Sequence, residues 1–302
     1  MGRIEFVFSG QGDQFPGMGK ELCAQYTKAK EVFDLCDKIR PITSKQCFEG
    51  TDEELKETKN TQPCLFAMEF AAANVLVDKG IVPEAVAGFS LGEVVACAFA
   101  GITDIETGFR LVCKRGELMQ DAADKYDTSM AAVLKLDNEK VKELCSKYSA
   151  VYPVNFNCPG QVSVAGLTSQ MSDFYTDVKE AGGRALPIKV KGGFHSPFME
   201  KAADAFADEL SKVTFNNAKT VVYSNKTAEP YSNDVVELLS KQICSPVRWE
   251  ELIRNMIING IDTFIEIGPG RTLTNMIKKI NTEVKVYSVS DLPVILSEVA
   301  EC

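Results

Sequence analysis

The hydrophobic positions of this chain follow two spacings in turn, which predicts that strands and helices alternate. Two short apolar runs, residues 4–8 and 85–88, have the pattern of buried strands. Longer stretches have the spacing of helices, at residues 21–26, 29–39, 61–79, 91–99 and 104–123. Short buried strands separated by helices are typical of an α/β fold with a parallel sheet covered on both faces.

The pattern changes near residue 128, where strands become as frequent as helices. The expected order is strand, helix, strand, strand, helix and strand, at residues 130–136, 138–148, 151–156, 161–165, 168–181 and 184–190. This βαββαβ order is that of the ferredoxin-like unit. We therefore predict a small ferredoxin-like subdomain over residues 128–191, inserted into a larger domain made of residues 1–127 and 192–302.

The larger domain resumes with the same alternation. Helices are expected at residues 197–213, 234–244 and 249–258, and strands at 220–224, 262–267 and 284–289. The predicted fold class is thus α/β, with a mainly parallel sheet in the large domain. In such an arrangement a cleft between the two domains is the natural place for a site.

Composition and charge exclude several classes of protein. The chain has 302 residues, of which 45% are hydrophobic and 25% charged, as in ordinary soluble globular proteins. A net charge of -9 argues against nucleic acid, which needs concentrated Lys and Arg. The chain begins with a strand, not a leader, and no apolar run is long enough for a membrane span. Ten cysteines without a Cys-x-x-Cys pair suit a reducing compartment, so we expect a cytoplasmic protein.

The strongest candidate for chemistry is Ser90, in the string Gly88-Phe89-Ser90-Leu91-Gly92. A strand before it and a helix after it are the setting that a nucleophile elbow requires, with glycines that allow the tight turn. The string by itself is weak, because short motifs of this kind also arise by chance. The alternative is a structural serine in a turn.

A serine needs a base to become a nucleophile, and the usual base is imidazole. The chain has a single histidine, His195, in a glycine-containing loop before Pro197. A lone histidine is often structural, but any Ser-His mechanism here must use it. No carboxylate stands in the usual α/β-hydrolase order, so another group is expected to orient the imidazole. One histidine and dispersed cysteines also predict that there is no metal site.

Arg115 stands within a predicted helix beside Gly116, which weakens that helix. The functional reading is a guanidinium that binds a carboxylate in the cleft. The alternative is a surface arginine paired with Glu117 or Asp121. The glycine-dense loop over residues 10–19 similarly has two readings, a backbone cradle or a mobile turn. Residues 157–160 and 268–270 have the composition of turns.

Seven ordered stretches of this sequence, spread over almost the whole chain, resemble one family. They are Gly10-Gln11-Gly12-x-Gln14, Gly88-x-Ser90-Leu91-Gly92-Glu93, Arg115-Gly116, Asn157-x-Pro159-Gly160-Gln161, Phe194-His195, Gln242-x-x-x-Pro246-Val247-x-Trp249 and Gly268-Pro269-Gly270. They are similar to the malonyl-CoA:acyl carrier protein transacylases, the acyltransferase family of fatty acid and polyketide synthesis. The resemblance implies an α/β-hydrolase-like large domain with a ferredoxin-like insertion.

The resemblance also implies roles for particular residues. Ser90 would be the acylated nucleophile, His195 its base, and the main-chain carbonyl of Gln242 the group that orients the imidazole. The backbone N–H groups of Gln11 and Leu91 would form the oxyanion hole. Substrate-binding positions would be Arg115, which pairs with the malonyl carboxylate, and Phe194, Met119 and Asn157. Phe194 has the bulk expected of a malonyl-selective member, because its ring would crowd a methyl branch.

The expected reaction is transfer of malonyl from malonyl-CoA to the phosphopantetheine thiol of acyl carrier protein, in fatty acid or polyketide synthesis. No cofactor is implied, and we expect a monomer. Two alternatives remain, an acyl hydrolase of the same fold and a non-catalytic module that docks the carrier protein. Cationic candidates for docking are Lys189, Lys191, Lys278 and Lys279. One position departs from the family pattern, since Phe89 stands where a histidine is usual.

Overall fold

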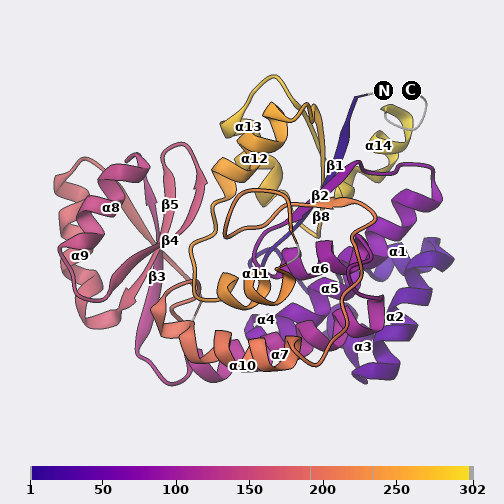
Figure 1. Cartoon of the computed structure of the whole chain (residues 1–302), viewed down its shortest axis with the longest axis horizontal. Helices are drawn as coiled ribbons and strands as arrows, with labels where there is room; N and C mark the ends of the chain where they lie inside the picture. The colour runs from indigo at the N-terminus through magenta and orange to yellow at the C-terminus, as the bar shows by residue number, and fades with distance from the viewer. Residues whose placement is uncertain (1, 191, 233, 299–302) are drawn as a thin grey trace.

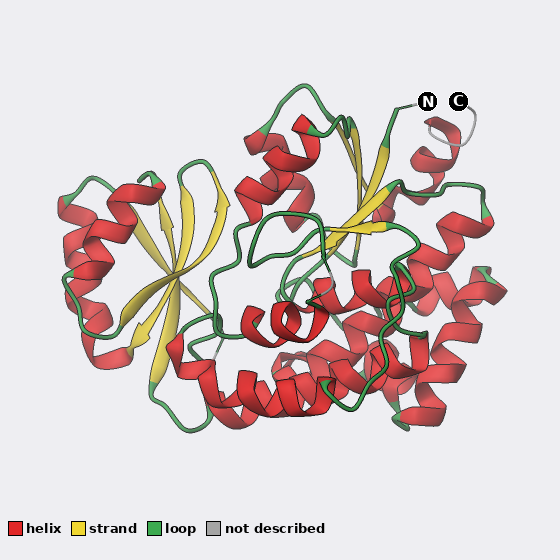
Figure 2. Cartoon of the chain, in the orientation of Figure 1, coloured by secondary structure: helices red, strands yellow, loops and turns green. Residues whose placement is uncertain are grey.

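The chain folds around two separate sheets, one parallel and one antiparallel (Figures 1 and 2). A computed structural model describes residues 2–190, 192–232 and 234–298. The first and the last described segments of the chain both belong to the part of the molecule that holds the parallel sheet (Figure 1). Within the described part of the chain, no helix combines the length and the apolar character needed to cross a membrane.

The larger sheet is parallel throughout. Its strands, in spatial order, are β7 (Val221–Val222), β2 (Ala85–Gly88), β1 (Ile4–Phe8), β8 (Thr263–Ile267) and β9 (Lys285–Ser288). Every residue of β1, β2 and β8 is buried, as expected for strands with helices on both faces. Because β1 and β2 run side by side in the same direction, the loops that follow them leave the sheet at one edge. The predicted parallel sheet is confirmed.

Helices pack on both faces of this sheet, because alternate side chains of each strand point to opposite sides. Phe6 and Phe8 belong to the core formed with the helices of the first 123 residues, and Val7 and Phe264 to a second core with the late helices. The early helices are α1 (Lys20–Gln25), α2 (Thr27–Ile39), α3 (Thr43–Glu49), α4 (Asp52–Lys56), α5 (Thr58–Asp78), α6 (Leu91–Phe99) and α7 (Ile105–Ala123). The later ones are η1 (Pro197–Met199), α10 (Glu200–Leu210), α11 (Val235–Gln242), α12 (Trp249–Ile258), α13 (Thr272–Ile280), η2 (Val289–Asp291) and α14 (Leu292–Glu298).

The smaller sheet is antiparallel and lies beside the larger part (left in Figure 2). Its elements are β3 (Thr128–Leu134), α8 (Asn138–Ser146), β4 (Val151–Cys158), β5 (Gln161–Leu167), α9 (Thr168–Glu180) and β6 (Arg184–Ile188). The strand order β4-β5-β3-β6 and the βαββαβ connection confirm the ferredoxin-like prediction. Ala131 and Val133 pack beneath α8 and α9, and Met130 points to the other face.

Several elements differ from the sequence-based expectation. The short helices α3, α4 and α14 were not predicted, because five to seven residues are too few to show a helical period. The helix expected over residues 197–213 is a 3-10 turn, η1, followed by α10. The strand expected over residues 220–224 is reduced to Val221–Val222, since the chain turns at Ser224, whose carbonyl accepts from Ala228 N–H.

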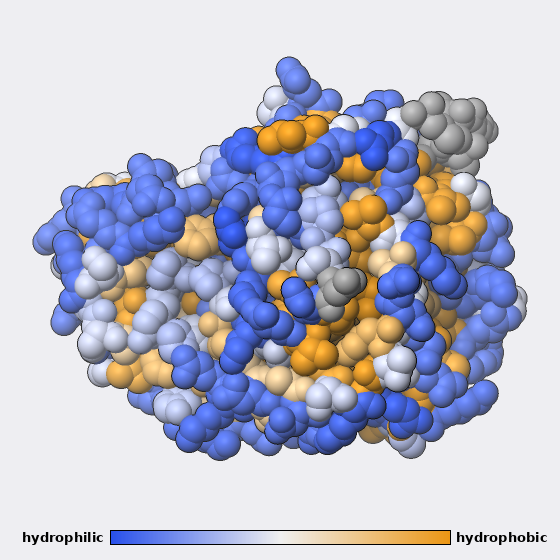
Figure 3. Space-filling model, viewed as in Figure 1, coloured by the Kyte–Doolittle hydropathy of each residue, from blue (hydrophilic) through white to orange (hydrophobic). Residues whose placement is uncertain are grey.

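On the face of the molecule shown in the space-filling view, hydrophilic residues cover most of the outer rim, and hydrophobic residues gather in the central part (Figure 3). This distribution is ordinary for a protein surface, of which apolar atoms always contribute a large share. The surface alone therefore does not locate a site, and the polar groups inside the molecule do so instead.

Candidate active site

Ser90 lies in the turn between β2 and α6, with a positive φ of 55° that non-glycine residues rarely adopt. A Cβ on Gly88 would lie 1.9 Å from the carbonyl carbon of Gly92, and one on Gly92 would lie 2.3 Å from the carbonyl oxygen of Phe8. Both glycines are therefore required, because β1, β2 and α6 meet here without room for side chains. The strand-turn-helix setting of a nucleophile elbow is present.

His195 lies directly beside Ser90. Its Nε2 is 2.7 Å from Ser90 Oγ, and its Nδ1 is 2.9 Å from the main-chain carbonyl oxygen of Gln242. Because a carbonyl only accepts, Nδ1 carries the proton and Nε2 is left to accept from the Ser90 hydroxyl. Burial, together with the positive charge of Arg115, lowers the pKa of His195 to about 4. The imidazole is thus neutral at pH 7 and able to take a proton.

A main-chain carbonyl stands where many serine enzymes have a carboxylate. Gln242 is the last residue of α11, and the final carbonyls of a helix carry its partial negative charge. The backbone N–H of His195 donates to the carbonyl of Ile243 at 3.1 Å, which holds the histidine loop against the same helix end. The end of α11 therefore orients the imidazole through a carbonyl in place of a carboxylate.

The Arg115 side chain is completely buried and points from α7 toward Ser90. Its Nη2 donates to Ser90 Oγ at 3.1 Å and to Gln242 Oε1 at 2.7 Å, and its Nη1 donates to Gln62 Oε1 at 2.8 Å. Burial lowers the pKa of Arg115 to about 10, so the guanidinium is charged at pH 7. The alternative of a surface arginine paired with Glu117 or Asp121 is wrong, because Arg115 is buried whereas both acidic residues are exposed.

The glycine beside this arginine has a packing role. A Cβ on Gly116 would lie 3.0 Å from the carbonyl oxygen of Thr58, at the start of α5. The missing side chain lets α7 approach α5 closely, and Gln62 of α5 then reaches the guanidinium of Arg115. The helix-weakening glycine is explained by this close approach.

The two residues whose backbone N–H groups are expected to form the oxyanion hole, Gln11 and Leu91, line the same cavity as Ser90. Leu91 is the first residue of α6, so its N–H is one of those that a helix leaves without an intrahelical carbonyl. Gln11 lies in the loop after β1, at the same sheet edge as Ser90. Thr272 Oγ1 donates to Asp13 Oδ1 at 2.5 Å and joins this loop to the start of α13. The glycine-dense loop is thus tied to the fold.

Asn225, which the sequence reasoning missed, holds the elbow from its far side. Its Oδ1 accepts from the Ser90 N–H at 2.7 Å, and its Nδ2 donates to the Gly88 carbonyl at 2.7 Å. One side chain thereby satisfies both ends of the strained turn. An asparagine soon after a strand of the parallel sheet was a usable signal, because such strands end at one edge.

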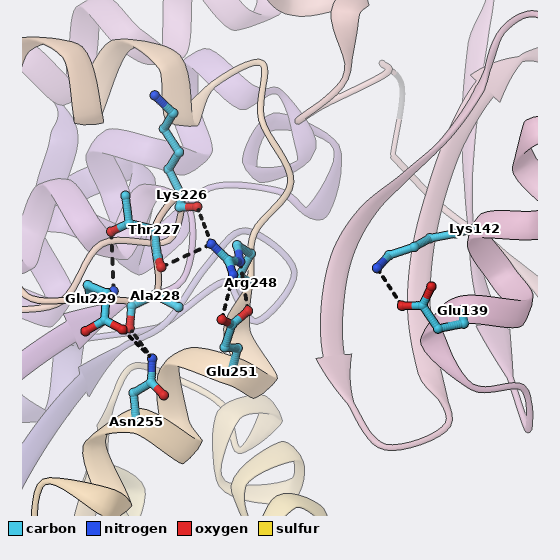
Figure 4. A network of polar contacts seen from close by, with 9 residues as sticks. All are labelled: Glu139, Lys142, Lys226, Thr227, Ala228, Glu229, Arg248, Glu251 and Asn255. Carbon is cyan, nitrogen blue, oxygen red and sulfur yellow. Dashed lines mark hydrogen bonds and ion pairs between the residues drawn. The ribbon is translucent and has the colours of Figure 1, made fainter.

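The loop that follows Asn225 is fixed in turn by two side chains around α12 (Figure 4). Arg248 donates through Nη1 to the Thr227 carbonyl at 3.1 Å and pairs with Glu251 through Nε and Nη2 at 2.8 and 2.5 Å. Asn255 Nδ2 donates to the Ala228 carbonyl at 2.9 Å. Figure 4 shows Asn255 below the loop and Arg248 beside it, so the backbone of the loop is held from two directions.

A cavity of about 250 Å³ lies at Ser90, between the two sheets. The part around the parallel sheet lines it with Gly10, Gln11, Ser90, Leu91, Met119, Phe194 and His195, among others. The antiparallel sheet contributes Met130, Ala132, Asn155, Asn157, Gln161, Ser163 and Ile188. Asn157 Nδ2 donates to Ser163 Oγ at 3.1 Å, and its Oδ1 has no partner among the described residues.

All the predicted site residues are therefore gathered around one serine. Arg115 and Gln242 lie directly behind Ser90, and the others border the cavity itself. Within the described ranges, no group of three or more His, Cys, Asp or Glu side chains is placed to hold a metal ion. The arrangement supplies a hydroxyl, a neutral base and a buried cation, which together suit covalent acyl chemistry.

Comparison with known proteins shows the family to which this chain belongs. The acyl transferase domain family matches residues 5–294. The chain belongs to the acyl transferase family. The resemblance found in the sequence motifs is thereby confirmed.

The relatives within the acyl transferase family match this chain over nearly all of their length. The malonyl CoA-acyl carrier protein transacylase of Bacillus subtilis (strain 168) is 40% identical, over 96% of this chain and 94% of its own. The solved structure of the transacylase of that name from Clostridium perfringens is 36% identical, with a TM-score of 0.95 over 99% of this chain and 98% of its own. A further structure, at 33% identity and a TM-score of 0.91, covers 95% of this chain and 94% of its own. It is a complex of a malonyl-transacylase with its type II polyketide acyl-carrier protein.

Phe89, next to the nucleophile, packs its ring against the side chain of Trp249. The ring centroids are 5.5 Å apart in an edge-to-face arrangement, and Phe89 also borders the cavity. A phenyl ring donates no conventional hydrogen bond, so this wall beside Ser90 is apolar. Polar recognition of a substrate must then come from the other walls.

Proposed function

We propose that this chain transfers a malonyl group from malonyl-CoA to the phosphopantetheine thiol of an acyl carrier protein, through a malonyl ester on Ser90. The observation that carries the proposal is the Ser90 hydroxyl between the neutral His195 imidazole, at 2.7 Å, and the buried Arg115 guanidinium, at 3.1 Å. A base on one side and a cation on the other suit an acyl group that bears a carboxylate.

In the first half-reaction, Ser90 Oγ attacks the thioester carbon and its proton passes to His195 Nε2. The carbonyl oxygen becomes an oxyanion, for which the N–H groups of Gln11 and Leu91 are the proposed donors. The C–S bond then breaks, and the sulfur of coenzyme A leaves with the proton from His195. In the second half-reaction the carrier-protein thiol attacks the ester, and the same groups act in reverse order. Each proton has a protein donor or acceptor, so we propose that no cofactor takes part.

Arg115 is proposed to bind the malonyl carboxylate. Its guanidinium already contacts Ser90 Oγ, the atom to which the acyl group becomes attached, and its Nε has no partner among the described residues. Asn157 and Met119 are proposed to contact the acyl chain from the cavity wall. Phe194, beside the base, is proposed to crowd a branch at the carbon between the two carbonyls.

We further propose a division of the chain into a catalytic domain, residues 1–127 and 192–302, and a small subdomain, residues 128–191. The carrier protein is proposed to approach the mouth of the cleft between them, where Lys189, Lys278 and Lys279 are exposed. Lys279 Nζ lies 3.4 Å from Gln161 Oε1, which is at the cavity. The fourth candidate for docking, Lys191, is outside the described residues. A monomer in the cytoplasm remains our expectation.

Intact-mass measurement after mixing with malonyl-CoA or acetyl-CoA tests the proposed function. We expect one malonyl group per chain, mapped by peptide analysis to Ser90, and none on Ser90→Ala, which keeps the fold but lacks the hydroxyl. Addition of an acyl carrier protein in its phosphopantetheine form should discharge the ester. A label on a cysteine, or on the alanine variant, would contradict the mechanism. A label released by water as fast as by carrier protein would favour an acyl hydrolase.

A further inference from the structure

A line of buried polar side chains runs behind Ser90 and ends at a carboxylate that the proposed reaction does not use. Glu93, three residues after Ser90 on α6, has no exposed surface. Its Oε2 accepts from Gln242 Nε2 at 2.6 Å, and Gln242 Oε1 in turn accepts from Arg115 Nη2 at 2.7 Å. A single amide therefore joins the carboxylate of Glu93 to the guanidinium of Arg115.

The direction of this amide follows from its neighbours. Gln242 Nε2 also donates to the main-chain carbonyl of Ser90, at 2.7 Å. A side-chain amide has one donating end and one accepting end, so two acceptors at the nitrogen end leave the oxygen facing Arg115. If the amide were reversed, its N–H groups would face the N–H groups of Arg115. Glu93 is therefore one of the two acceptors that set the direction of the amide, and this amide holds the guanidinium.

The electrostatics of the site single out the same carboxylate. The three hydrogen-bond acceptors of the Arg115 guanidinium, Gln62 Oε1, Ser90 Oγ and Gln242 Oε1, are all neutral. Glu93 is the group whose negative charge opposes the effect of burial on the pKa of Arg115. Tyr231, which donates its hydroxyl to Glu93 Oε1 at 2.6 Å, and Gln242 both favour the charged carboxylate, although burial raises the pKa of Glu93 to about 7.

We propose that Glu93 is a positioning residue for acyl-group selection, which acts through the side-chain amide of Gln242 to hold the Arg115 guanidinium at Ser90. The inference rests on the proposed function, because it is there that Arg115 binds the malonyl carboxylate. Gln242 serves both halves of the site, since its main-chain carbonyl faces His195 and its side chain faces Arg115. Loss of the Glu93 carboxylate therefore disturbs the Gln242 side chain that holds Arg115, but leaves the Gln242 main-chain carbonyl at His195 in place.

The test compares kcat/KM for malonyl-CoA and for acetyl-CoA, because acetyl transfer needs His195 but has no carboxylate for Arg115. In Glu93→Ala the amide loses the oxygen that accepts from Gln242 Nε2, and we expect the malonyl-to-acetyl ratio to fall about tenfold, the scale of a buried N–H left without its acceptor. Glu93→Gln keeps an oxygen that accepts from Gln242 Nε2, so it should recover most of the ratio.

Tyr231→Phe is the matched control. It removes the hydrogen bond from the Tyr231 hydroxyl to Glu93, which has the same 2.6 Å length, and leaves the hydrogen bond from Gln242 to Glu93 intact. We expect its malonyl-to-acetyl ratio to stay within about twofold of the parent, since the amide keeps both of its acceptors.

A double-mutant cycle with Arg115→Ala completes the test. If Glu93 acts through Arg115, Glu93→Ala should not change the ratio further once the arginine is gone. Should Glu93→Ala fail to fold, Gln242→Met removes the amide while keeping the main-chain carbonyl, and should show the same selective loss. A parent that prefers malonyl, together with a Glu93→Ala enzyme that loses both activities equally, would overturn the role of Glu93 alone. A parent that takes up no malonyl would overturn the proposed function and this inference with it.

Discussion

The two sheets present different kinds of group to the one cavity. The parallel sheet offers the ends of its strands, so that Gln11 follows β1, Ser90 follows β2 and Asn225 follows β7. The antiparallel sheet offers one of its faces, from which strand residues such as Met130 and Asn157 border the cavity. Strand ends bring backbone N–H groups and helix starts, whereas a sheet face brings only side chains.

This difference leads us to expect a division of labour. Changes around the parallel sheet should alter the chemical step or the charge that selects the acyl group. Changes on the antiparallel face should alter binding only, because no residue there touches Ser90 Oγ or His195 in the hydrogen bonds of the described chain. The following experiments test that division, from the largest expected effect to the smallest.

His195→Ala should slow acylation of Ser90 by about a hundred- to ten-thousand-fold, which is the usual contribution of a general base. The loss should be alike for malonyl-CoA and acetyl-CoA, since both need the same proton transfer. Stopped-flow or quenched acylation followed by mass measurement gives the rate, and thermal unfolding shows whether the fold is kept. A rate within a few-fold of the parent would remove His195 from this role.

Arg115→Ala should lower kcat/KM for malonyl-CoA by about a hundredfold or more, because breaking a buried ion pair costs about 3 to 5 kcal/mol. Acetyl transfer should stay level or rise, since no charge is left uncompensated. Arg115→Lys, which keeps the charge but not the planar fork, should fall between. Arg110→Ala, on the exposed side of the same helix, is the control and should change neither. A parallel loss for both thioesters would assign Arg115 a structural role.

The pH dependence of Ser90 acylation should show that the His195 imidazole stays neutral, and so able to accept a proton, at mildly acidic pH. An ordinary histidine of pKa 6.5 is only about one tenth neutral at pH 5.5. Burial and Arg115 lower the pKa of His195 to about 4, so the neutral form should persist as the pH falls. With acetyl-CoA as the donor, the single-turnover rate at pH 5.5 should stay within about threefold of that at pH 7.5. A tenfold fall centred near pH 6.5 would show that the imidazole titrates normally.

Asn157→Ala tests the antiparallel face and should have the smallest effect. We expect KM for malonyl-CoA to rise about two- to tenfold with kcat nearly unchanged, the scale of one neutral hydrogen bond. Asn157 Oδ1, which has no partner among the described residues, is the hydrogen-bond acceptor that the variant would no longer offer to the substrate. A fall in kcat comparable to that of His195→Ala would show that the smaller sheet takes part in the chemical step.

Prediction from the sequence succeeded where a local pattern carried the information. The period-two and helical runs located all nine strands and most helices of the described chain, although several ends shifted by a few residues. The βαββαβ order predicted the antiparallel sheet because each element of that unit is long enough to show its own period. The helices α3, α4 and α14 were missed because they are only one or two turns long.

The side-chain contacts behind Ser90 could not be predicted from the sequence, although the resemblance named Arg115 and Gln242 and the place of Asn225 after a strand was a usable signal. Asn225 lies 135 positions from the Ser90 N–H to which it bonds, and Gln242 lies 127 positions from Arg115. Neither contact leaves a trace in local spacing, because it depends on how α7, α11 and the loop after β7 pack around the elbow. Asn225 was therefore not predicted as a site residue, and Glu93 was named only as part of the motif around Ser90, without a role.

By itself, the sequence determined an alternating α/β chain, an elbow serine, a single histidine and membership of the acyl transferase family. These are properties of short stretches and of their order along the chain. The tertiary structure decided that Arg115 is buried and faces Ser90, and that a helix end replaces the missing acid. It also decided that Glu93 is joined to Arg115 through one amide. The hydrophobic pattern of a helix does not predict that a charged side chain such as Arg115 is buried. Burial of this charge requires polar partners, and packing brings these partners from distant segments of the chain.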